Sequence, residues 1–135
     1  MSESPVRELR VAVTVEDYEH ALVFYRDALG LPVVESWDDP GGRSGAILDA
    51  GRATLELLSV PQTAHVDEVE VGRPGVSPPI RFALEVDDSI AAAKALVEAG
   101  ARQLAEPAVT PWNHRNVRIE APGALQLTLF TVLDG

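Results

Sequence analysis

The chain lacks cysteine and long apolar runs. The absence of cysteine excludes disulfides, thiolate metal ligands and a cysteine nucleophile, and it fits a reducing compartment, so we expect a cytoplasmic protein. No apolar run approaches the roughly 18 residues that a membrane span needs. Residues 1–5 have neither the basic nor the apolar region of a signal peptide. We therefore expect no membrane partner.

Basic residues are also scarce, because 11 Lys and Arg face 21 Asp and Glu, which gives a formal net charge of −10. This excess repels phosphate groups and argues against nucleic acid as a partner. A solvated acidic surface that keeps the protein soluble explains it most simply, although a cationic ligand stays open. With 135 residues, 46% of them hydrophobic, the chain is long enough for one domain with its own core.

Two stretches of the sequence occur twice. Leu9–Asp17 (LRVAVTVED) is echoed by Ile80–Asp88 (IRFALEVDD), and Arg52–Val60 (RATLELLSV) is echoed by Ala124–Val132 (ALQLTLFTV). An internal repeat of this kind predicts two copies of one structural unit, neither of which buries its apolar surface alone. The copies should pack together or swap between chains.

The hydrophobic pattern assigns the same elements to both copies. Apolar residues alternate in each first strand, an aspartate caps each helix, and Gly30 or Gly100 ends it. The first helix is expected to face the core with Tyr18, Ala21, Leu22, Tyr25, Ala28 and Leu29. Strands are predicted at about 7–15, 32–37, 44–49, 53–60, 80–87, 115–121 and 124–132, and the second helix at 89–99.

These elements predict a single domain over residues 1–135. Repeat one covers about 7–60, a proline-containing connector covers 61–79, and repeat two covers about 80–133. Each repeat then has the order βαβββ.

Each predicted sheet has one aliphatic face and one mixed face. On the mixed faces, Arg10, Glu56, Arg81 and Thr128 take equivalent places. Such a face usually meets solvent. If both sheets curve toward each other, however, the two faces line one cleft, and periodicity does not choose between these arrangements.

Three sequence motifs give information about the fold that the hydrophobic periodicity does not. They are Val15-Glu-Asp17 with Ala21-Leu-Val-Phe-Tyr25-Arg and Leu29-Gly-Leu31, then Pro111-Trp-Asn-His-Arg115, and finally Ala121-Pro-Gly-Ala-Leu-Gln-Leu-Thr-Leu129. In this order they resemble the vicinal oxygen chelate superfamily, which includes glyoxalase I, extradiol dioxygenases and bleomycin-resistance proteins. The resemblance implies an α+β fold of two tandem βαβββ repeats, with curved mixed sheets around a central cleft and helices on the outer faces. It also implies a homodimer.

The resemblance further implies that catalytic members hold a divalent metal with one residue from each of four strands. These positions fall on Arg10, Glu56, Arg81 and Thr128. Only Glu56 binds a metal well, because arginine stays protonated and has no lone pair to donate. The histidines, His20, His65 and His114, show no metal-ligand spacing. We therefore expect no metal and no cofactor.

The two arginines suggest a different use of the cleft. Arg10 and Arg81 suit an anionic group of a small-molecule ligand, because a guanidinium donates paired hydrogen bonds. Alternatively, Arg10, Glu56 and Arg81 form an internal ion cluster. Trp37 and Trp112 either stack a flat ligand or plug the ends of the sheets. The predicted ligand contacts are Arg10, Arg81, Thr128, Trp112, Arg115 and Trp37.

Two functions of different classes follow. The first is a metal-independent protein that binds and sequesters a small molecule, as the bleomycin-resistance branch of the family implies. The second is a metal-independent lyase or isomerase, with Glu56 as a general base whose pKa the arginines lower and with Arg10 and Arg81 stabilising an enolate-like intermediate. An accessory domain without a ligand is the third possibility.

Overall fold

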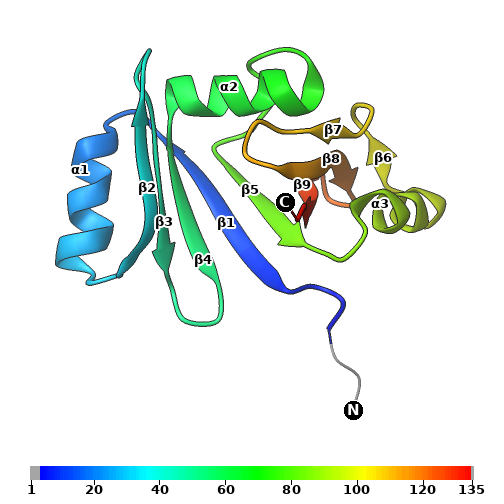
Figure 1. Ribbon diagram of the computed structural model, residues 1–135, viewed down its shortest axis with the longest axis horizontal. Coiled ribbons are helices and arrows are strands. Elements are labelled where there is room, and N and C mark those ends of the chain that lie inside the picture. Colours follow the sequence, from blue (N-terminus) through cyan, green and yellow to red (C-terminus); the bar gives the residue numbers. More distant parts are fainter. Residues whose placement is uncertain (1–3, 135) are drawn as a thin grey trace.

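Figure 1 shows the computed structural model of the protein, which describes residues 4–134. The fold is built on a single sheet in the order β2-β3-β4-β1-β5-β9-β8-β6, with β7 paired to β8 off this path. The strands are β1 (Glu8–Val15), β2 (Val33–Asp39), β3 (Arg43–Asp49), β4 (Thr54–Ser59), β5 (Ile80–Glu85), β6 (Arg102–Gln103), β7 (Ala108–Val109), β8 (His114–Ala121) and β9 (Leu125–Val132).

The pairing of β1 with β5 joins the two halves of the chain. These strands run antiparallel, whereas each pairs in parallel with the last strand of its own half, β4 or β9. The two halves therefore share one continuous sheet within one chain, which bends so that the halves face each other below α2 (Figure 1). The α+β architecture with curved sheets and outer helices is thus confirmed.

Helices cover the outer face of each half. Helix α1 (Tyr18–Leu22) continues as a π-helical turn, η1 (Val23–Ala28), beside β2 to β4, and α3 (Ser89–Glu98) lies over β8 and β9 (Figure 1). Under α1, the aliphatic residues of β3 and β4 form one core cluster. Under α3, the second cluster contains Val86, Ala93, Val117, Ile119 and Leu129. The aliphatic face of the sheet is buried by this packing, and its mixed face is left for the concave side.

The predicted connector contains a helix that the sequence analysis missed. Helix α2 (Val60–Val71) begins after Ser59, whose hydroxyl accepts a hydrogen bond from the backbone N–H of Gln62, and ends at Gly72 with a φ of 87°. Pro61 lies in the first helical turn, where a missing N–H does no harm. The proline that suggested an irregular connector is therefore compatible with a helix start.

The first helix also differs from its predicted form. After Leu22 the backbone widens to η1, which rotates the following side chains away from the expected stripe. Tyr18, Leu22 and Tyr25 pack against the core, but Leu29 is 60% exposed and Ala28 is exposed too. The expectation that these last two residues face the core is therefore wrong.

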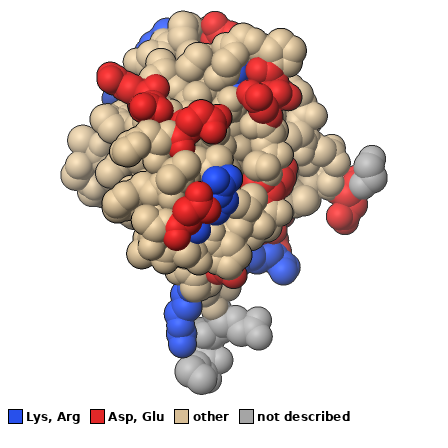
Figure 2. Space-filling model, turned by 90° about the vertical axis from the view of Figure 1, so that its left-hand side faces the viewer, with Lys and Arg blue, Asp and Glu red and all other residues tan. Residues whose placement is uncertain are grey.

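The exterior reflects the composition. Figure 2 views the side of the molecule on which α1 lies, where acidic side chains are scattered among uncharged ones and basic side chains are few. Within residues 4–134, no helix has both the length and the apolar character to cross a membrane.

Candidate functional site

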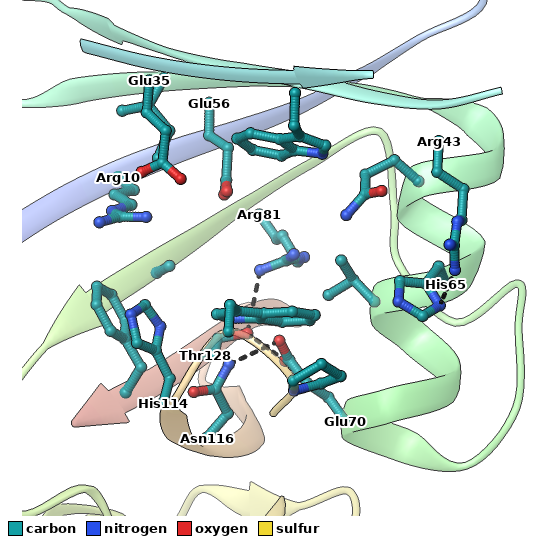
Figure 3. A pocket seen from close by; sticks show the side chains of 18 of the residues that line it. Arg10, Glu35, Arg43, Glu56, His65, Glu70, Arg81, His114, Asn116 and Thr128 are labelled. Carbon is teal, nitrogen blue, oxygen red and sulfur yellow. Dashed lines mark hydrogen bonds between the residues drawn. The ribbon is translucent and has the colours of Figure 1, made fainter. Parts of the chain in front are cut away.

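The concave face of the sheet and helix α2 enclose a cavity of about 570 Å³ (Figure 3). This volume suits a small molecule. The strand register explains which side chains reach it, because directly paired residues share one face of a sheet. Ala12 pairs with Glu56 on one side and with Arg81 on the other, while Ala83 pairs with Arg10 and Thr128.

Nearly all of the predicted site residues line this cavity. They are Arg10, Trp37, Glu56, Arg81, Trp112 and Thr128. Arg115 does not line it, because on β8 the alternate residues His114 and Asn116 face the cavity. Arg115 shares the opposite face with Val117 in the core under α3, and its backbone carbonyl accepts a hydrogen bond from Ser89 at 2.8 Å. The predicted ligand contact from Arg115 is therefore corrected by the strand register.

Arg81 is a buried cation without a carboxylate partner. It is 4% exposed, and its Nη1 donates a 3.0 Å hydrogen bond to the hydroxyl of Thr128. No ion pair to Arg81 is formed within residues 4–134. A guanidinium has five N–H donors, and burying it unpaired costs several kcal/mol. Its unused donors, at the cavity wall, suit an anion.

Arg10 differs, because its charge is already paired. Its Nε lies 3.1 Å from a carboxylate oxygen of Glu8, and the guanidinium lies 5.0 Å from the ring centroid of Phe130. Across the described part of the chain, no ion pair joins Glu56 to either Arg10 or Arg81. The structure therefore does not form the internal ion cluster that was the alternative to a ligand site.

The carboxyl of Glu56 faces the same cavity. Burial raises its pKa, and the charges of Arg81 and Arg10 oppose this rise without cancelling it. The arginines do lower this pKa, as expected, but desolvation raises it by more.

A buried ionic network joins α2 to the sheet below this cavity. Arg118 on β8 has no exposed surface, and its Nη1 lies 3.1 Å from Asp67 while its Nε donates to Glu70 at 3.0 Å. Glu70 also accepts hydrogen bonds from Asn116 at 2.9 Å and from Thr128 at 2.8 Å. One carboxylate thus contacts three strand residues at once.

This network reaches Arg81 through Thr128, whose hydroxyl donates to Glu70 and accepts from Arg81 (Figure 3). The two carboxylates on α2 exceed the single charge of Arg118, and the surplus negative charge balances Arg81 across Thr128. The ion pairs of Arg118 were not predicted from the sequence. Asp67 and Glu70 lie 51 and 48 residues away in the chain, on a helix that was not predicted.

His114 is a further cavity residue that was not among the predicted contacts. Its ring stacks on Phe130, with centroids 4.9 Å apart and planes 17° apart. Burial, and then the charge of Arg10, lower the pKa of His114. His114 could have been predicted as a cavity residue, because it alternates along the strand with Asn116 and Arg118 and therefore shares their face of the sheet.

The side chains at the four expected metal-ligand positions do not fit a divalent cation; these positions are Arg10, Glu56, Arg81 and Thr128. Two of the four are guanidinium groups, which repel a cation and offer no lone pair, and Thr128 is engaged by Arg81 and Glu70. Over residues 4–134, no group of three or more His, Cys, Asp and Glu side chains is placed to hold a metal ion.

We expect Arg118→Met to lower the free energy of unfolding by about 3–5 kcal/mol, because Asp67 and Glu70 would stay buried without their cation. Urea unfolding measures this loss. The control is Arg102→Met, which removes an ion pair whose arginine is 70% exposed and should change stability by less than about 1 kcal/mol. Equal losses in both variants would contradict the role of the network.

Glu56→Gln tests the raised pKa. Folding raises the pKa of Glu56 above its unfolded value of 4.5, so the folded state holds the carboxyl proton more tightly than the unfolded state does. The stability that this provides is fully present below pH 4.5 and is lost as the pH rises through the folded pKa. We therefore expect the variant to gain stability relative to the wild type between pH 5 and pH 8. Thermal unfolding across this range measures the difference, and a growing loss in the variant would mean that Glu56 is ionised and stabilised.

The paired halves, the outer helices and the inward-facing side chains of four central strands define a protein of mixed α+β type whose curved sheet lines a cavity. The sequence profile of the Glyoxalase/Bleomycin resistance protein/Dioxygenase superfamily matches residues 9–128, and the chain belongs to this superfamily. No curated protein gives a significant match.

Solved structures share the fold at low sequence identity. A variant of methylmalonyl-CoA epimerase from Streptomyces coelicolor, in complex with 2-nitronate-propionyl-CoA, is 20% identical with a TM-score of 0.67, covering 97% of this chain and 100% of its own. A hypothetical protein from Bacillus halodurans C-125 is 18% identical with a TM-score of 0.68, covering 93% and 94%. A superfamily member from Vibrio splendidus 12B01 is 12% identical with a TM-score of 0.63, covering 92% and 97%. These similarities establish the fold alone.

Proposed function

We propose that the protein binds and sequesters a small anionic molecule in this cavity without a divalent metal, and that Arg81 contacts the anionic group. The observation that carries the proposal is a guanidinium that is almost fully buried at a cavity wall and has one neutral hydroxyl as its partner. An anion would satisfy its remaining donors with charge-assisted hydrogen bonds.

The rest of the cavity supports such a ligand. Trp37 and Trp112 line it from opposite halves of the chain and offer aromatic surface to a flat molecule. Arg10, whose charge is paired with Glu8, adds a second guanidinium to the cavity lining (Figure 3). The homodimer stays a prediction.

Arg81→Met should abolish the binding of small carboxylates and phosphates, because it removes the unpaired donors. It should cost the free protein less stability than Arg118→Met does, because Arg81 forms no direct ion pair within residues 4–134. A thermal-shift panel of anionic and cationic aromatic compounds measures both effects. A ligand at one hundred times its dissociation constant stabilises the wild type by about 2.7 kcal/mol.

The matched control is Arg73→Met, which removes an exposed arginine outside the cavity. It should bind anions as the wild type does. Stabilisation by the cationic compounds alone would sink the anion proposal and favour sequestration of a cationic compound.

A proton-transfer enzyme is the second candidate, favoured by the half-buried Glu56, on which the charge of Arg81 acts. A raised pKa makes the ionised carboxylate a stronger base. Glu56 would take the proton from a carbon next to a carbonyl group. The C–H electron pair would form the new C=C bond while the C=O π pair moves onto oxygen, and Arg81 would stabilise the resulting negative charge. Returning the proton to the other face of the carbon is an isomerisation, and the fold is shared with an epimerase.

Exchange with deuterated water tests this second candidate. For a carboxylic acid that binds, the wild type should catalyse loss of the proton signal next to the carbonyl group, with a rate that rises through the pKa of Glu56. Glu56→Gln should slow this exchange by about a hundredfold or more, whereas Arg73→Met should not. Binding without any exchange would exclude the enzyme and leave the binding protein.

A further inference from the structure

The cavity has a second cationic region on the side of Arg81 away from Arg10 (Figure 3). It is formed by Arg43 at the start of β3 and by His65 and Gln62 on α2. Gln62 and His65 are three residues apart on the helix and so share one of its faces. None of the three belongs to the central group of Arg10, Glu56, Arg81 and Thr128.

The hydrogen bonds of Arg43 leave its charge unpaired. Its Nη1 lies 3.1 Å from Nδ1 of His65, and its Nε donates to the carbonyl oxygen of Pro40 at 3.1 Å. Asp39 pairs with it across the β2–β3 hairpin as a backbone neighbour, but no ion pair to Arg43 is formed within residues 4–134. The region therefore holds a positive charge that no carboxylate of the described chain neutralises by contact.

The contact with Arg43 determines which ring nitrogen of His65 donates a hydrogen bond. A guanidinium only donates, so Nδ1 of His65 is the acceptor and the proton of the neutral ring resides on Nε2. Figure 3 shows this second ring nitrogen facing the interior of the cavity. His65 thus presents an N–H group beside the positive charge of Arg43.

Gln62 adds an unsatisfied amide to the same wall. Its side chain is 6% exposed and makes no hydrogen bond to residues 4–134, and its Oε1 is buried without a partner. Buried amides in folded proteins are almost always hydrogen-bonded. An anion at this wall would accept from the Nε2 amide donors of Gln62, whereas the buried Oε1 is an acceptor and gains no partner from it.

We propose that Arg43, His65 and Gln62 form a second anion subsite, so that the ligand carries two anionic groups, as a small dicarboxylate or a phosphorylated carboxylic acid does. One group contacts Arg81 and the other contacts Arg43 and His65, with the body of the molecule between Trp37 and Trp112. This inference rests on the proposed anion-binding function and names its ligand class.

Matched compounds test the subsite. Calorimetric titration compares dicarboxylates of increasing chain length, each with the monocarboxylate of the same length, and phosphorylated acids form a third arm. The wild type should bind one length of dianion at least about tenfold more tightly than its monoanion, because a hydrogen bond to a charged group contributes that much or more. The preferred arm distinguishes a carboxylate from a phosphate at the second subsite.

Variants separate this inference from the proposed function. Arg43→Met should remove the preference for the dianion and leave monoanion affinity within about twofold, whereas Arg81→Met should weaken both. Arg73→Met is the charge-matched control and should change neither affinity. Gln62→Met, which keeps the arginine in place, should reduce the preference partly, and the unfolding midpoint without ligand shows that each variant is folded.

Two outcomes are decisive against the inference. If the wild type binds monoanions and dianions equally at every length and in the phosphorylated arm, the second subsite is wrong and the anion-binding function survives. If no anion binds, the proposed function is wrong and the subsite fails with it.

Discussion

The ion pairs of Arg118 with Asp67 and Glu70 hold the cavity together. Helix α2 forms one wall of the cavity, yet of its buried side chains only Val66 is apolar. Hydrophobic burial therefore contributes little to the docking of this helix, and the charged contacts to β8 take its place. Because a buried carboxylate without its cation is strongly unfavourable, the position of α2 is tied to Arg118. Every side chain that α2 presents to the cavity, including His65, depends on this attachment.

The same network explains how the protein tolerates Arg81. Taken with Arg118, the carboxylates of Asp67 and Glu70 carry one surplus negative charge, and Thr128 lies between this surplus and Arg81. The cation is balanced at a distance, so its donors stay available in the free protein. A direct carboxylate partner would have stabilised Arg81 more but would have competed with an anionic ligand for the same N–H groups.

Much of the sheet and its inward side chains could be predicted, because strand alternation is local and the second half repeats it. Arg10, Glu56, Arg81 and Thr128 reach one cavity for this reason. Arg115 was expected there from the resemblance of the loop around Trp112, but its position on β8 turns it to the opposite face. Helix α2 escaped prediction because its buried face is polar and leaves no apolar period. The partners of Arg118 could not be found without it, since nothing local pairs charges that lie 48 and 51 residues apart.

The side chains at the centre of the sheet determine what chemistry the cavity can support. A fixed guanidinium stabilises negative charge through oriented hydrogen bonds, but it has no open coordination position at which to activate water or polarise a bound oxygen as a metal does. The chemistry that remains for this donor set is anion binding, with proton transfer through Glu56. Burial raises the pKa of Glu56 and also leaves the Arg81 guanidinium with little exposed surface. In the two proposals, binding and proton transfer are two uses of one cavity, and catalysis would require that a bound anion place an acidic C–H group against the Glu56 carboxylate.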